Sequence, residues 1–170
     1  MFLGRAVLEY KRRFLIPQPF GKDIKQTTFI AAPIEKVYDI IASADGWNAF
    51  FTTGMELDPK PGGKMTWRWK DWGPLFYTTD AQAEVVRAEC PDIFAFQWYP
   101  VGKDNPTTIT FALSAKYGGT VVELTESGYP DTEAGRAMIL ECASGWGEAL
   151  TLLKFYIEHG IVYAQPKKEE

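Results

Sequence analysis

Histidine and cysteine are scarce in this chain of 170 residues, which has one histidine, His159, and two cysteines, Cys90 and Cys142. A single histidine excludes Ser-His-Asp and Cys-His catalysis and any metal site built from several histidines. The two cysteines are far apart and form no Cys-x-x-Cys pattern, which indicates reduced thiols in the cytoplasm. We therefore expect no metal and no cofactor, and we assign no catalytic residue.

The chain also lacks an excess of basic residues and lacks long apolar runs. Its formal net charge is −4, so the basic face that binds nucleic-acid phosphates is not expected. No apolar run reaches the roughly 18 residues of a membrane span. Near the N-terminus, Arg5, Glu9 and the basic residues 11–13 interrupt the apolar residues, so a signal peptide is not predicted.

Aromatic residues, in contrast, are abundant at 15% of the chain, and they include six tryptophans. A chain of this length forms one globular domain that buries about 70% of its unfolded surface. We place this domain at residues 23–162. Residues 1–22 form an N-terminal extension, and residues 163–170 form a flexible tail.

The N-terminal extension has the spacing of an amphipathic helix. Leu3, Val7, Tyr10 and Phe14 recur at steps of three or four residues and define one apolar face. Such a helix packs by default on its own domain or on a second subunit, so the protein is expected to be a monomer or a homodimer. Contact with a membrane surface is the alternative.

The order of predicted elements is that of an α+β fold. A strand over residues 23–33 precedes a helix that begins near Pro33 and a short helix over residues 43–51. Period-2 patterns then predict further strands at 55–57, 64–73, 78–91, 93–100, 107–115 and 121–127. A curved antiparallel sheet of this size can wrap around a helix and bury one face of it.

The last predicted element is a long helix from about Thr132 to His159. Its apolar residues recur at steps of three and four, and Gly160 is a typical residue at a helix C-terminus. Gly145 and Gly147, in its middle, cost about 1 kcal/mol each relative to alanine. We expect a close approach to the sheet, a kink, or space for a ligand to accompany them.

Several segments, in this order, resemble one superfamily. They are "AAPIEKVYDII", "PGGK", "VVRAECPDIFAFQW", "GGTVVELTESG" and "GWGEALTLLKFYIEHG", with Trp47 after the first. Over about residues 23–160 the chain resembles the helix-grip superfamily, which includes START lipid-transfer domains, polyketide cyclases and the birch-pollen allergen. The closest branch is that of proteins similar to the activator of the heat-shock chaperone ATPase. The resemblance implies about seven antiparallel strands around the C-terminal helix, with an apolar cavity between them.

Aromatic side chains on alternate strand positions are the candidate ligand contacts. Trp67 and Trp69 share one face of their strand, whereas the same alternation places Trp72 on the opposite face. Large side chains that face the small residues of the long helix can fill a core or line a pocket. The candidate ligand-binding residues are Trp67, Trp69, Phe94, Phe96, Trp98, Phe111, Glu126, Cys142, Trp146, Ala149 and Leu153.

Glu126 carries the most specific functional hypothesis among these candidates, because it is a carboxylate that follows the inward alternation of Val122 and Leu124. The alternative is that it lies in water at the end of the strand. A buried carboxylate that is neutral or hydrogen-bonded to a neighbour would be structural, and Glu126→Gln would then be tolerated. One that faces a cavity would orient or protonate a ligand.

Three functions follow from these observations. The first is binding of a small apolar or aromatic ligand, lipid-like or polyketide-like, between the sheet and the helix. The second is an enzyme of the cyclase or dehydratase type that uses an acid in the pocket. The third is a protein-interaction module of the chaperone-cofactor kind. An open cavity with one buried acid favours the second, an open cavity without any favours the first, and a filled core favours the third.

Overall fold

A computed structural model describes residues 19–166 of the chain. The elements are β1 (Ile24–Ile30), α2 (Ile34–Ile41), α3 (Ala44–Phe50), β2 (Glu56–Leu57), β3 (Lys64–Trp72), β4 (Tyr77–Glu89), β5 (Ile93–Trp98), β6 (Thr107–Lys116), β7 (Gly119–Ser127) and α4 (Glu133–His159). The predicted N-terminal helix falls on residues that lie almost entirely outside the described part.

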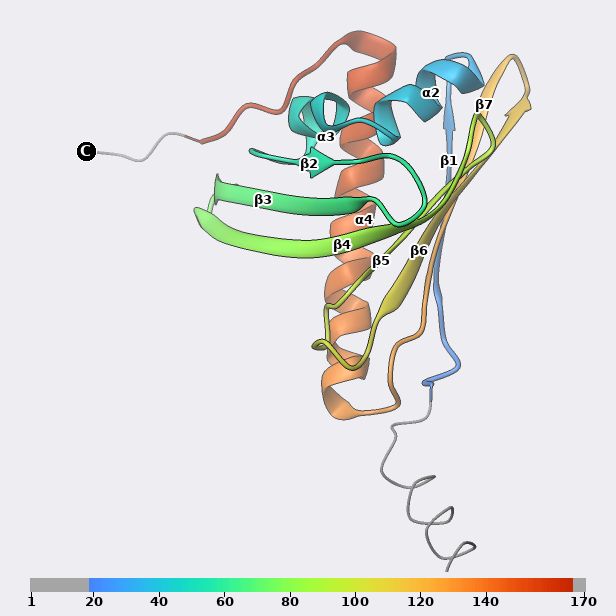
Figure 1. Ribbon diagram of the computed structural model, residues 1–170. Helices are drawn as coiled ribbons and strands as arrows, with labels where there is room; N and C mark the ends of the chain where they lie inside the picture. The colour runs from blue at the N-terminus through green and yellow to red at the C-terminus, as the bar shows by residue number, and fades with distance from the viewer. Residues whose placement is uncertain (1–18, 167–170) are drawn as a thin grey trace, which may run out of the picture.

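The seven strands form one antiparallel sheet in the order β1-β7-β6-β5-β4-β3-β2. The sheet curves around α4, and β3 and β4 swing across the helix while β1, β6 and β7 run beside it (Figure 1). The register shifts between Trp69 and Trp72 in β3 and between Val85 and Arg87 in β4. Such irregularities bend strands and increase their twist. The predicted helix-grip fold is confirmed.

Helix α4 begins and ends where the sequence indicates. The Thr132 side chain accepts a hydrogen bond from the Gly135 N–H at 3.0 Å, so Thr132 is the N-cap and not the first helical residue. Gly160 at the other end has a φ of 68°, a left-handed conformation that glycine adopts without steric cost.

Helix α4 is fixed to one side of the sheet. It packs most closely on β1 and α3. The Gln26 side chain of β1 donates a hydrogen bond to the Ala143 carbonyl at 2.8 Å, and the backbone N–H of Ala31 donates to Glu158 at 2.7 Å. Since these bonds hold the helix to β1, the space between sheet and helix lies on the side of β3 and β4.

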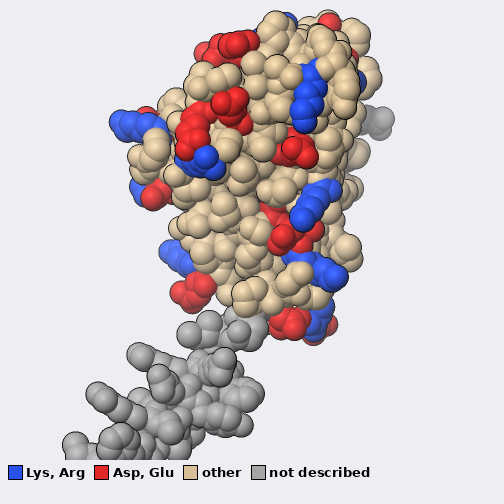
Figure 2. All heavy atoms as spheres, turned by 90° about the vertical axis from the view of Figure 1, so that its right-hand side faces the viewer, with Lys and Arg blue, Asp and Glu red and all other residues tan. Residues whose placement is uncertain are grey.

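The outer face of the sheet is solvated and mixed in charge. Figure 2 shows the face on the right-hand side of Figure 1, where acidic and basic side chains are interspersed and neither sign forms a broad patch. Within residues 19–166, no helix is long and apolar enough to cross a membrane.

Candidate functional site

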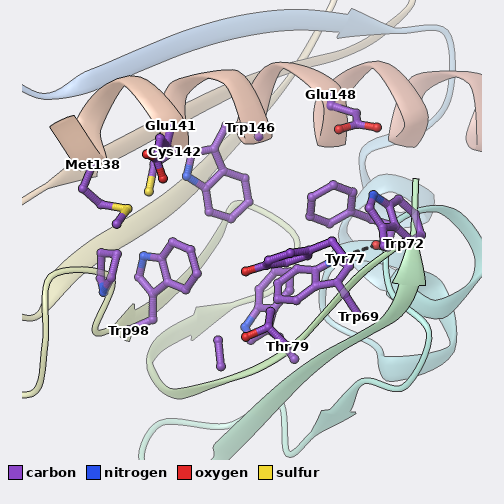
Figure 3. Close-up of a pocket in the computed structure, with 15 residues that line it drawn as sticks. Trp69, Trp72, Tyr77, Thr79, Trp98, Met138, Glu141, Cys142, Trp146 and Glu148 are labelled. Carbon is purple, nitrogen blue, oxygen red and sulfur yellow. Dashed lines mark hydrogen bonds between the residues drawn. The ribbon is translucent and has the colours of Figure 1, made fainter. Parts of the chain in front are cut away.

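A cavity of about 440 Å³ lies between α4 and the strands β3, β4 and β5. Figure 3 shows side chains from the helix on one side and from the strands on the other. The residues that line it are Phe51, Trp67, Trp69, Trp72, Tyr77, Thr79, Ala81, Trp98, Pro100, Met138, Glu141, Cys142, Gly145, Trp146 and Glu148. Five of the six tryptophans of the chain are among them.

Strand β3 supplies the aromatic floor of the cavity. The rings of Trp67 and Trp69 stack with centroids 5.6 Å apart and an angle of 18° between their planes. The Trp69 N–H donates to the Phe51 carbonyl at 2.8 Å, which fixes the indole and brings the segment after α3 to the cavity. The Trp67 N–H is buried without a hydrogen-bond partner.

Trp72 lines the same cavity, so its predicted place on the opposite face is wrong. The irregularity between Trp69 and Trp72 is the cause, because an extra residue resets the alternation of a strand. Asp71, within it, has a φ of 52°. The Trp72 ring then stacks on Tyr163 of the segment after α4, with centroids 4.2 Å apart.

Glu126 is fully buried behind the cavity wall and lines no part of the cavity. Its Oε1 accepts hydrogen bonds from the Trp98 indole at 2.8 Å and the Thr107 hydroxyl at 2.6 Å. Its Oε2 accepts one from the Trp146 indole at 2.6 Å. The inward alternation of β7 is confirmed, and the exposed alternative is wrong. The carboxylate joins two wall tryptophans that come from β5 and α4.

An indole N–H can only donate, and an ionised carboxylate can only accept. A glutamine at position 126 would therefore set its NH₂ group against Trp98 or Trp146, whichever way its amide turned. The sequence predicts that Glu126→Gln is tolerated if Glu126 is hydrogen-bonded to a neighbour. The geometry indicates the opposite, because the glutamine NH₂ group cannot accept a bond from an indole.

Tyr129 and Cys142 lie beside this carboxylate and complete a buried polar cluster. Burial, and next the charge of Glu126, raise the pKa of the Cys142 thiol to about 12. The same causes, in the same order, raise the pKa of the Tyr129 hydroxyl, which is buried without a well-aligned hydrogen bond. Both groups stay protonated at neutral pH. Cys142, which lines the cavity, is therefore an apolar wall residue and not a nucleophile.

Two carboxylates, Glu141 and Glu148, are the charged groups that residues 19–166 contribute to the cavity lining. Both residues are exposed, and neither forms an ion pair with another residue of the range 19–166. In Figure 3, Glu141 lies on α4 near Met138, and Glu148 lies near the end of the cavity where Trp72 is. The cavity thus has an aromatic interior and acidic side chains at its edge.

Gly145 marks the point where α4 borders the cavity. A β-carbon built on Gly145 meets no atom within 4 Å, so this glycine leaves open space. A β-carbon on Gly147 meets the Gln26 side chain at 3.7 Å, on the side of β1. The open space beside Gly145 agrees with the predicted space for a ligand, and the contact beside Gly147 agrees with the predicted approach to the sheet.

The structure brings together part of the candidate residue set. Five of the candidates line the cavity: Trp67, Trp69, Trp98, Cys142 and Trp146. Six are buried behind or beside it: Phe94, Phe96, Phe111, Glu126, Ala149 and Leu153. Phe96 and Phe111 still contact the wall through the Trp146 ring.

Ten lining residues were not among the candidates, and strand pairing would have found three of them. Ala81, Thr79 and Tyr77 are the cross-strand partners of Trp67, Trp69 and Trp72. Helical spacing from Cys142 relates Met138 and Gly145 to the same face of α4. Glu141 and Glu148 are three residues after Met138 and Gly145, and Pro100 continues the alternation of Trp98, whereas Phe51 and Trp72 carry no comparable signal.

The described residues 19–166 contain no group of three or more histidine, cysteine, aspartate or glutamate side chains placed to hold a metal ion. The cavity lining offers a ligand mainly aromatic surface, with carboxylates at its edge.

Comparison with known proteins places this geometry in a family. The family model described as Activator of Hsp90 ATPase homolog 1-like protein matches residues 31–158. Comparison with curated proteins found no significant match. Among solved structures, protein SSP2350 from Staphylococcus saprophyticus is 25% identical with a TM-score of 0.67, and the alignment covers 85% of this chain and 98% of that one.

Two further solved structures share the fold. The Aha1 protein from Colwellia psychrerythraea, described as a dimer, is 22% identical with a TM-score of 0.68, over 82% of this chain and 98% of that one. DynU16, described as a putative protein in the dynemicin biosynthetic locus, is 16% identical with a TM-score of 0.69, over 83% of this chain and 49% of that one. At these identities the likeness concerns the fold alone.

Proposed function

The chain belongs to the family of Activator of Hsp90 ATPase homolog 1-like proteins, and from this premise we propose that it binds a small apolar or aromatic ligand between the sheet and α4. The observation that carries the proposal is the cavity of about 440 Å³ lined by five tryptophans. Its volume lies within the range of roughly 300–1,000 Å³ that is usual for ligand sites. The physiological partner is accordingly a small hydrophobic molecule.

The hydrogen bonds of the wall support this proposal. The indole N–H groups of Trp69, Trp98 and Trp146 all donate to protein oxygens. These three tryptophans therefore offer a ligand their ring faces and not their donors. Fixed rings of this kind suit a flat or apolar molecule that is held by burial and stacking.

The position of Glu126 argues against it as the acid of the enzyme alternative, which would then depend on Tyr77, Glu141 or Glu148 in the lining. A cyclase or dehydratase of the type considered needs an acid or base within reach of its substrate. The buried acid Glu126 lies behind the wall, and its oxygens accept bonds from Trp98, Thr107 and Trp146. This arrangement supports a role for Glu126 in shaping the cavity. An open cavity also favours ligand binding over a module that acts only through its surface.

The test is a titration with the neutral fluorophore N-phenyl-1-naphthylamine, read by quenching of tryptophan emission and by probe fluorescence. We expect saturable binding by the unmodified protein. Gly145→Leu should weaken it at least tenfold, since this side chain enters open space in the cavity. Ser144→Leu, one residue along α4 on an exposed position, is the matched control and should bind as the unmodified protein does.

Absence of saturable binding, or equal loss in both leucine variants, would contradict the proposal. Native mass spectrometry of freshly purified protein adds a direct measurement, because a ligand that co-purifies is seen as added mass. The same spectra distinguish a monomer from the homodimer that the sequence leaves open. Location in the cytoplasm is a separate prediction, which cell fractionation tests.

A further inference from the structure

The charges around the cavity point to one class of ligand. Among the described residues 19–166, the lining contains two carboxylates, Glu141 and Glu148, and no lysine, arginine or histidine. The two glutamates are seven residues apart on α4, which is about 10 Å along a helix. Gly145 lies between them, so they flank the stretch of helix that is open to the cavity.

The indole rings add to this electrostatic preference. The face of an aromatic ring carries negative potential and attracts cations, and tryptophan does so most strongly. Trp67, Trp69, Trp72, Trp98 and Trp146 surround a single cavity. A cationic group inside it would lie among indole rings from β3, β5 and α4, with Glu141 and Glu148 on either side of Gly145.

The field of Glu141 reaches the cavity wall. Glu141 is one of the charges that raise the pKa of the Cys142 thiol, together with the stronger effects of burial and Glu126. In Figure 3 the Glu141 and Cys142 side chains leave the same turn of α4. An anion in the cavity would be repelled from the same positions, whereas a neutral ligand would gain nothing from them.

We propose that the preferred ligand is a hydrophobic cation, an amine or quaternary ammonium attached to an aromatic or aliphatic body, with the indoles around its charge and Glu141 and Glu148 at the mouth. This inference rests on the proposed ligand-binding function, because it specifies the ligand of the same cavity. It goes further by predicting the sign of the ligand's charge.

The experiment compares two naphthyl probes of the same shape, one ending in a trimethylammonium group and the other in its neutral isostere, a tert-butyl group. We expect the cationic probe to bind about tenfold more tightly at low ionic strength, and its advantage to shrink in 0.5 M salt. In the double variant Glu141→Gln/Glu148→Gln the advantage should fall to twofold or less, because the cationic probe loses more affinity than the neutral one.

Glu123→Gln is the matched control, because it removes the same charge from an exposed position on β7, away from the cavity. It should keep the tenfold preference. If both probes bind the unmodified protein equally, or if the preference survives in the double variant, the cation proposal is wrong while the ligand-binding function stands. If neither probe binds, both proposals fail.

Discussion

Replacing Glu126 with glutamine tests the central contact of the structure. The carboxylate accepts three hydrogen bonds, from Trp98 and Thr107 at one oxygen and from Trp146 at the other. The Thr107 hydroxyl can rotate and accept a bond, but the two indoles can only donate. One indole N–H must therefore face the new NH₂ group.

The magnitude follows from these three bonds. One charge-assisted bond is lost, which costs about 1.5–3 kcal/mol, and the other two weaken to neutral bonds at about 1 kcal/mol each. Removing the buried charge offsets part of this loss, because a neutral amide is easier to desolvate. The expected net loss of unfolding free energy is about 2–3 kcal/mol. For a domain of this size that lowers Tm by roughly 5–10 °C.

The assay is urea unfolding followed by tryptophan fluorescence, combined with a thermodynamic cycle that includes Trp146→Phe. Phenylalanine at position 146 removes one of the two donors, so the glutamine amide can turn its NH₂ group toward that side. The double variant should therefore lose at least 1 kcal/mol less than the sum of the single variants. A loss below 0.5 kcal/mol for Glu126→Gln, or simple additivity, would refute this account of the cluster.

Four further predictions concern α4 and the segment after it. Gly145→Ala and Gly147→Ala should each raise the free energy of unfolding by about 1 kcal/mol, because alanine has the higher helix propensity and neither new methyl group clashes. Chemical denaturation measures this change, and destabilisation by either variant would contradict the prediction. Cys142 should resist alkylation by iodoacetamide at pH 8 in the folded state while the exposed Cys90 reacts, as mass spectrometry would show. The folded-state pKa of Cys142 is raised from 9.0 to about 12, so the protonated thiol contributes stability that is present below pH 9 and lost as the pH rises through 12. Cys142→Ala should therefore flatten the decline of stability at high pH. An unchanged pH profile would argue against the raised pKa. Tyr163→Ala removes the ring that stacks on Trp72, so we expect a red-shifted tryptophan emission and a decrease of about 1 kcal/mol in the free energy of unfolding. An unchanged emission spectrum would mean that the contact does not shield Trp72 from water.

The fold was accessible from the sequence because its determinants are local and periodic. The steps of three and four residues in α4, the Thr132 cap, the alternation in β3 to β7 and the Gly62-Gly63 turn each specify a nearby backbone conformation. The inward orientation of Glu126 followed from the same alternation. The likeness of ordered segments to a known superfamily then supplied the curvature of the sheet around the helix.

Only the tertiary structure decided which aromatic residues line the cavity and what Glu126 does there. An irregularity in β3 turns Trp72 inward, and alternation cannot reveal it because it depends on an extra residue that breaks the period. Phe94, Phe96 and Phe111 follow the same inward pattern as Trp67, yet they pack as core because α4 lies close to β1 and away from β3 and β4. The three partners of Glu126 are 28, 19 and 20 residues away in the chain, and all of them are donors. Periodicity specifies the side of a strand on which a residue lies, whereas the distance between packed elements determines whether that side is filled by protein or left open.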